Sequence, residues 1–135
     1  MLKLIVGLKG SGKTKELISL VNKTTGESNG SVVCIEKGNK LIHEIGYRTR
    51  LVDCDDYGID NAVSLYGMVA GMFASNHDIT HVFIDSALKI CNNDLESFEK
   101  FINSVKSFGE KNGVDFVITS SIHVDDLPVS LKAYL

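Results

Sequence analysis

The chain has 135 residues, of which 44% are hydrophobic and 23% charged, a composition typical of a packed globular protein and unlike that of a disordered one. This length corresponds to one ordinary domain, so we expect a single core over residues 1–135 and no separate substrate domain. The formal net charge of -3 excludes a general electrostatic affinity for nucleic acid or for an anionic membrane.

Ten elements are predicted from the spacing of apolar residues and from the glycine and proline positions. In chain order they are a strand at 2–6, a helix at 13–22, a strand at 32–35, a short helix at 41–46, a minor strand at 51–54, a helix at 60–75, a strand at 81–85, a helix from 93 to 109 or 113, a strand at 116–118 and a helical turn from 128. Continuously apolar strands that alternate with helices are typical of a parallel sheet covered on both faces. We therefore predict an α/β fold of three layers, α/β/α, with a mainly parallel sheet.

Single residues predict how two of the helices begin and pack. Asp60 is expected to cap the helix that follows it, and Asn93 with Glu96 has the spacing of a capping box. Gly67 and Gly71 interrupt the apolar face of the first of these helices. We expect these two glycines to permit close packing of the helix on the sheet.

The sequence contains no pattern that indicates a membrane segment or a structural metal site. No apolar run approaches the roughly 20 residues of a membrane helix, and the first strand leads into glycines instead of a signal-peptide cleavage site. We therefore expect a cytoplasmic protein without membrane contact. Cys34, Cys54 and Cys91 lack Cys-x-x-Cys spacing, and the four histidines lack metal-ligand spacing, so neither disulfides nor zinc are expected.

The segment between the first strand and the first helix matches the pattern G-x-x-x-x-G-K-[ST] in full. Its glycines let successive backbone N–H groups turn inward around phosphate oxygens, at the positive end of the helix dipole. Lys13 is expected to reach the β- and γ-phosphates, and the Thr14 hydroxyl to ligate Mg²⁺. The residues expected to contact the nucleotide are Gly7, Lys9, Gly10, Ser11, Gly12, Lys13, Thr14 and Lys15. The pattern predicts a site for a nucleoside triphosphate, ATP with Mg²⁺.

Polar residues follow several of the predicted strands. Because ligands of parallel sheets lie beyond the carboxyl ends of the strands, we expect Gly7, Glu36, Asp85 and residues 119–121 at one rim. Asp85 ends an apolar strand, and we expect it to hold the Mg²⁺ shell through water. The alternative is that Asp85 only caps the next turn.

On these residues the chain resembles the P-loop NTPases, and its arrangement is similar to their RecA-like branch. This resemblance implies that strand 116–118 lies between strands 2–6 and 81–85. The stretch from Gly7 to Glu36 also resembles the start of thymidine kinases, but their zinc lobe needs paired cysteines that this chain lacks. The whole chain is most similar to small stand-alone ATP-binding proteins that are loosely labelled PilT-like, after twitching motility.

The resemblance also implies roles for residues at the strand ends. Many P-loop NTPases carry a catalytic Glu directly after the metal-associated Asp, whereas Ser86 follows Asp85 here. RecA-like members place this Glu after the second strand, which implies that Glu36 orients or deprotonates the attacking water; the alternative is a solvated strand-end Glu. A polar sensor of the γ-phosphate is implied among residues 119–121 and assigned to Ser120, unless this segment only begins the next loop.

The two arginines, Arg48 and Arg50, have two interpretations. In a ring or filament one of them would reach the γ-phosphate of a neighbouring copy, and the alternative is a surface role.

Three functions remain open from the sequence. The first is a RecA-like ATPase with slow intrinsic hydrolysis, accelerated by self-assembly or by a protein partner. The second is a nucleotide-dependent regulatory or binding module without significant turnover. The third is a small-molecule kinase that uses Glu36, Asp53, Asp55 or Asp56 near the acceptor.

Overall fold

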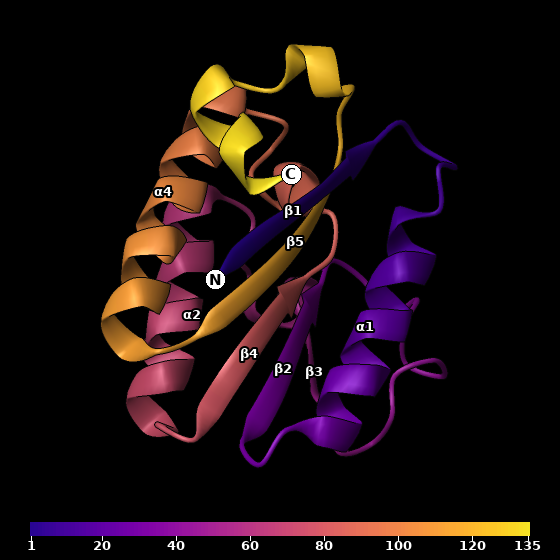
Figure 1. The fold of residues 1–135 in the computed structure, drawn as a ribbon, viewed down its shortest axis with the longest axis vertical. Helices are drawn as coiled ribbons and strands as arrows, with labels where there is room; N and C mark the ends of the chain where they lie inside the picture. Colours follow the sequence, from indigo (N-terminus) through magenta and orange to yellow (C-terminus); the bar gives the residue numbers. More distant parts are fainter.

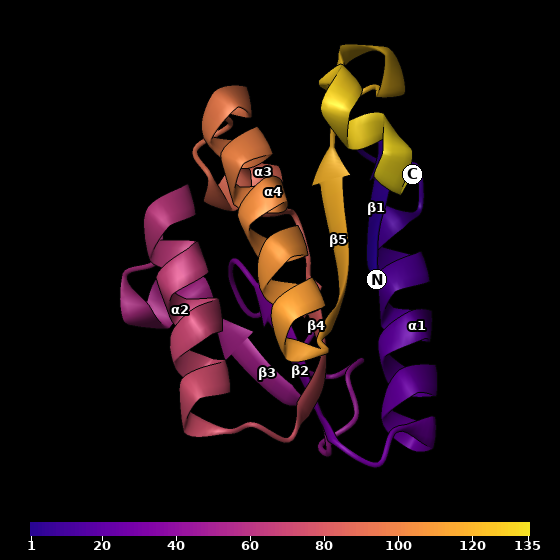
Figure 2. The same ribbon diagram turned by 60° about the vertical axis from the view of Figure 1, so that its left-hand side comes forward.

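The computed structural model describes residues 1–135 as an α/β protein built on a five-stranded parallel sheet, with helices on both faces (Figures 1 and 2). In spatial order the strands are β1 (Leu2–Gly7), β5 (Asp115–Ser121), β4 (Ile79–Ile84), β2 (Ser31–Glu36) and β3 (Arg50–Asp53). Every neighbouring pair is parallel, as the apolar strands predicted. Their carboxyl ends share one rim of the sheet, toward the top of Figure 1.

Strand β5 lies between β1 and β4, which confirms the position expected for residues 116–118. Phe116 is opposite Leu2 of β1 on one side and Val82 of β4 on the other. The last strand of the chain therefore joins the first strand to the rest of the sheet.

One face of the sheet is covered by α1 (Lys13–Glu27), which lies apart from the other long helices in Figure 2. Leu17 and Val21 of this helix are fully buried against side chains from β1, β2, β4 and β5. The helix continues past the predicted end at residue 22, and the Thr25 hydroxyl within the extension donates to the Val21 carbonyl. The polar residues 23–27 therefore form the last turn of α1, and Ser28 is its C-cap.

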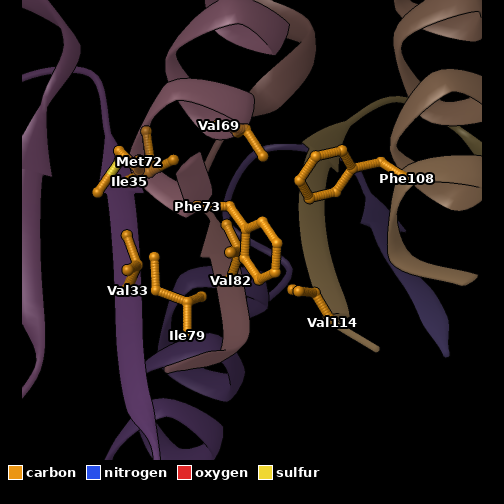
Figure 3. A pocket seen from close by; sticks show the side chains of 9 residues that line it. All are labelled: Val33, Ile35, Val69, Met72, Phe73, Ile79, Val82, Phe108 and Val114. Atoms are coloured by element: carbon orange, nitrogen blue, oxygen red, sulfur yellow. The ribbon is translucent and has the colours of Figure 1, made fainter. Parts of the chain in front are cut away.

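The opposite face is covered by α2 (Ala62–Ser75), α4 (Leu95–Asn112) and the C-terminal 3-10 helix η3 (Val129–Tyr134). Figure 3 shows the apolar contact between α2, α4 and the sheet, where the nine labelled side chains leave no room for a water molecule. The apolar stripe of α4 therefore belongs to the core. None of the helices has the length and apolar character needed to cross a bilayer.

Residues 41–46 do not form the predicted helix; they make only turns. The amides of Glu44 and Ile45 both bond to the Leu41 carbonyl, giving a single turn. Further along, the Asn22 side chain of α1 binds the Glu44 carbonyl and the Gly46 amide. The side chains of other elements thus set the path of this segment, and the helical spacing of its apolar residues was misleading.

Both predicted helix starts were wrong by one residue. Asn61, and not Asp60, caps α2 by accepting a hydrogen bond from the Ser64 amide. Asp94, and not Asn93, caps α4 by accepting hydrogen bonds from the Glu96 and Ser97 amides, whereas Asn93 precedes the cap with a left-handed φ of 56°. Three further short helices were not predicted: η1 (Cys54–Tyr57), α3 (Ala87–Ile90) and η2 (Val124–Asp126).

The glycines of α2 do not pack closely on the sheet, contrary to expectation. Gly67 and Gly71 are exposed, and a Cβ added to either would meet no atom within 4 Å. The close approach is made by Gly109 of α4, where an added Cβ would lie 2.5 Å from the Val114 carbonyl oxygen.

Candidate functional site

A tight glycine loop at residues 7–12 joins the carboxyl end of β1 to α1. Gly10 and Gly12 both have φ of +87°, a left-handed conformation that residues with a side chain rarely adopt. Gly7 has a different effect: a Cβ there would lie 2.5 Å from the Ser11 hydroxyl oxygen and would displace that side chain. The three glycines therefore allow a compact turn directly before the first turn of a helix.

Lys13 lies across this loop. Its Nζ donates a hydrogen bond to the Leu8 carbonyl at 3.0 Å and contacts the Ser11 hydroxyl at 3.4 Å. Its charge is therefore held beside the glycine loop, and Lys13 forms no ion pair with a carboxylate.

Asp85 is the centre of a hydrogen-bond network between three elements. Its Oδ1 accepts from the Thr14 hydroxyl of α1 at 3.2 Å and from the Thr119 hydroxyl of β5 at 2.8 Å. Asp85 and Thr119 are each only 1% exposed, so both depend on these partners in place of water. The glycine loop is thereby tied to the ends of β4 and β5.

Thr119 and Ser120 point to opposite faces of the sheet, because side chains alternate along a strand. The Thr119 hydroxyl also accepts from the Ser86 amide at 2.9 Å. The Ser120 hydroxyl donates to the Thr119 carbonyl and accepts from the Leu88 amide of α3 at 3.3 Å. Thr119 is thus the residue that meets Asp85, while Ser120, to which the sequence assigned the sensor role, holds α3.

Glu36 ends β2 as a buried carboxylate, 1% exposed. Its Oε1 accepts from the Lys40 amide at 3.1 Å and its Oε2 from the Leu41 amide at 3.3 Å. Burial raises the pKa of this carboxyl above its usual range, the two amide hydrogen bonds oppose that change, and the charges of Asp53 and Asp85 add to it. Both oxygens therefore hold the chain that follows β2, an arrangement not expected for a solvated strand-end glutamate.

A cavity of about 640 Å³ opens above the glycine loop at the rim of the sheet. It is lined by Lys9, Gly10, Gly12, Lys13, Thr14, Lys15, Lys40, Ser86, Leu88, Lys89, Asn93 and Ser121. Five of these residues are lysines and none is an Asp or Glu. The cavity is therefore strongly basic although the whole chain is acidic.

The structure brings most residues of the predicted loop to this cavity and adds others. Six of the twelve lining residues belong to the segment 7–15. The predicted site residues absent from the lining are Gly7, Ser11, Glu36, Asp85 and Ser120. Lys40 and Lys89 were not predicted, because neither belongs to a motif and only the fold brings them to the rim. None of the five lysines forms an ion pair with a carboxylate.

The remaining candidates lie away from the cavity or are already engaged. Arg50 begins β3 and Arg48 precedes it, so both lie at the amino end of the strand, opposite the rim. The Asp53 carboxylate accepts hydrogen bonds from the amides of Gly38 and Asp55. The Asp55 carboxylate forms an ion pair with Nζ of Lys37 at 2.7 Å. These acids stabilise the turns after β2 and β3.

No group of three or more His, Cys, Asp or Glu side chains is placed to hold a metal ion. Cys34, Cys54 and Cys91 are free and buried, and burial raises the pKa of their thiols to about 12, 12 and 11. These thiols are therefore packing residues and not nucleophiles at neutral pH.

The donor set at Thr14 and Asp85 fits a magnesium ion bound together with phosphate. Mg²⁺ at phosphate sites takes one or two protein oxygens and completes its shell with phosphate oxygens and water. Thr14 Oγ1 would be such an oxygen, and Asp85 Oδ1, 3.2 Å from it, would hold the water shell of the ion.

No model of a known protein family matches the sequence, and no curated protein is significantly similar to it.

Proposed function

We propose that this protein binds a nucleoside triphosphate, ATP with Mg²⁺, in the basic cavity above the glycine loop. The observation that carries the proposal is the cavity itself: about 640 Å³, lined by five lysines without carboxylate partners, at the point where a helix begins. Such a concentration of positive charge favours a polyanion of high charge density. The left-handed Gly10 and Gly12 are consistent with backbone amides turned toward phosphate oxygens.

The strand order supports a P-loop NTPase of the RecA-like branch. In that branch another strand separates the phosphate-loop strand from the acidic strand, and here β5 lies between β1 and β4. Asp85 follows β4 directly, and the Thr14 hydroxyl reaches it across the sheet. In this proposal Thr14 ligates Mg²⁺ and Asp85 holds its water shell.

We propose slow intrinsic hydrolysis for this ATPase. Glu36 remains the candidate to orient the attacking water, but both its oxygens are hydrogen-bonded to backbone amides and it does not line the cavity. A rapid reaction would require the turn at residues 37–41 to move and release this carboxylate.

The same observation favours a second candidate, a regulatory module that binds ATP with negligible turnover. In such a module the bound nucleotide holds the rim segments in one conformation, and a protein partner or a second copy recognises it. For the kinase alternative, Asp53 and Asp55 are engaged in turns and Glu36 is buried, which leaves Asp56 as its exposed candidate acid.

Titration calorimetry with Mg²⁺ and ATP tests the proposal. We expect saturable binding by the wild-type protein and no detectable binding by Lys13→Ala, with Lys23→Ala on the far part of α1 as the matched control. Release of inorganic phosphate over many turnovers would support the ATPase. ATP binding without phosphate release would support the regulatory module. Absence of heat at millimolar ATP or GTP, with the protein folded by circular dichroism, would refute nucleotide binding.

A further inference from the structure

Two of the five cavity lysines come from outside the glycine loop and its helix. Lys40 belongs to the turn after β2, and Lys89 belongs to the four-residue α3 after β4. They line the same cavity as Lys13 although they are distant from it in the sequence. The fold thus adds two positive charges to those supplied by residues 7–15.

Lys40 is held at the cavity by a buried side chain. The carboxylate of Glu36 binds the amides of Lys40 and its neighbour Leu41 at 3.1 and 3.3 Å. Burying a carboxylate is unfavourable unless hydrogen bonds compensate it, and the two amides of this turn supply that compensation. Glu36 is therefore a positioning residue for Lys40.

Lys89 is held by the end of β5 in a comparable way. The hydroxyls of Thr119 and Ser120, both 1% exposed, accept hydrogen bonds from the amides of Ser86 and Leu88. These contacts fix the turn that enters α3, including the left-handed Ser86 with φ 58°. The Thr119 hydroxyl also donates to Asp85, so one side chain binds both the acidic residue and the turn that leads to Lys89.

The charge of the cavity exceeds what the glycine loop alone supplies. Five lysines face one space, and none of them pairs with a carboxylate. Their mutual repulsion is relieved best by the ligand with the most negative charge. A nucleoside triphosphate carries one more phosphate than a diphosphate, and therefore more negative charge that Lys40 and Lys89 can neutralise.

We propose that Lys40 and Lys89 make this cavity select nucleoside triphosphates over diphosphates by contacting the terminal phosphate from two separately anchored segments. The inference rests on the proposed nucleotide binding and specifies which residues recognise the terminal phosphate. It also provides that recognition within one chain, without an arginine from a neighbouring copy.

The test is the ratio of ATP affinity to ADP affinity, measured by calorimetry with Mg²⁺ on the full chain. A charge pair about 4 Å apart in water contributes about 1 kcal/mol, so Lys40→Ala and Lys89→Ala should each lower this ratio about fivefold. The conservative variants Lys40→Arg and Lys89→Arg should retain most of it. Lys23→Ala, which removes an exposed lysine of α1 outside the cavity, should leave it unchanged.

Glu36→Gln tests the anchor of Lys40. This variant should lower the ATP to ADP ratio toward that of Lys40→Ala, and adding Lys40→Ala to it should have little further effect. A merely structural role for Glu36 would instead weaken ATP and ADP binding equally.

The possible failures are distinguishable. If the wild-type protein binds neither nucleotide, the proposed function fails and this inference fails with it. If both nucleotides bind and the ratio is the same in wild type, Lys40→Ala and Lys89→Ala, nucleotide binding stands and this inference is refuted. Because Lys40 and Lys89 are exposed side chains, their alanine variants are expected to remain folded.

Discussion

The Thr14 hydroxyl and Oδ1 of Asp85 are hydrogen-bonded at 3.2 Å, although 71 residues separate them in the chain. The contact exists because α1 begins at the carboxyl end of β1 while Asp85 follows β4, with β5 between the two strands. It holds the first turn of α1, which carries Thr14 at the wall of the five-lysine cavity, to the buried carboxylate that follows β4.

Asp85→Asn is expected to reduce the magnesium dependence of ATP binding. The substitution keeps the shape of the side chain and removes the charge that would hold the water shell of the metal, and outer-shell changes of this kind typically weaken metal affinity at least about tenfold. Calorimetry with ATP in magnesium and in EDTA measures the effect. Thr14→Ser is the control that retains a hydroxyl, and an Asp85→Asn protein with unaltered magnesium dependence would contradict the assignment.

Thr119→Val is expected to lower the free energy of unfolding by about 2 kcal/mol, because it removes two buried hydrogen bonds and leaves the Ser86 amide without its partner, while Oδ1 of Asp85 keeps only its bond from Thr14. Urea denaturation followed by circular dichroism measures the loss. Thr119→Ser keeps the hydroxyl and should retain most of the stability, whereas equal stability of the Val variant would show that water replaces both bonds.

Three helical glycines should respond to alanine in opposite directions. At Gly67 and Gly71 an added Cβ meets nothing within 4 Å, so each alanine should raise the free energy of unfolding by about 0.5–1 kcal/mol. At Gly109 the Cβ would lie 2.5 Å from the Val114 carbonyl oxygen, and overpacking of this kind should lower stability by about 1–3 kcal/mol. Thermal and urea unfolding of the three single variants measure these changes in stability. A Gly109→Ala protein that is more stable than wild type would contradict the close contact of Gly109 with Val114.

The buried Glu36 carboxyl predicts a specific dependence of stability on pH. Burial raises its pKa above the usual 4.5, so the folded protein binds this proton more tightly than the unfolded chain does. Its contribution to the free energy of unfolding should therefore be greatest below pH 4.5 and decline as the pH rises through the folded pKa. The difference in unfolding free energy between wild type and Glu36→Gln, measured from pH 4 upward, isolates this contribution. A difference that stays constant with pH would mean that Glu36 titrates normally.

The sequence was sufficient to locate the sheet but not its details. The strands are continuously apolar because helices cover both faces, and all five were predicted within a few residues of their ends. The short α3 was missed because four residues do not establish a helical period. The segment after Leu41 was predicted as a helix because its tertiary anchors, Asn22 and Glu36, are invisible in local spacing.

The candidate site was predictable only where a motif encodes it. The glycine loop has a fixed pattern, and Asp85 stands at the end of an apolar strand, so both could be proposed from the sequence. Lys40 and Lys89 belong to no pattern, and only the strand order brings their segments to the same cavity. Neighbouring strand residues always point to opposite faces, but the sequence leaves open that Thr119, and not Ser120, is the one that reaches Asp85.

The pairing of β1 with β5 has a consequence for how the protein is made. During synthesis β1 leaves the ribosome first among the five strands, yet its partner in the sheet is the strand made last. Strand β1, which leads into the glycine loop, therefore remains without a hydrogen-bonding partner strand until about residue 121 has emerged. Nascent chains stalled before that point should expose the apolar β1 to chaperones and should gain protease resistance only when β5 is released.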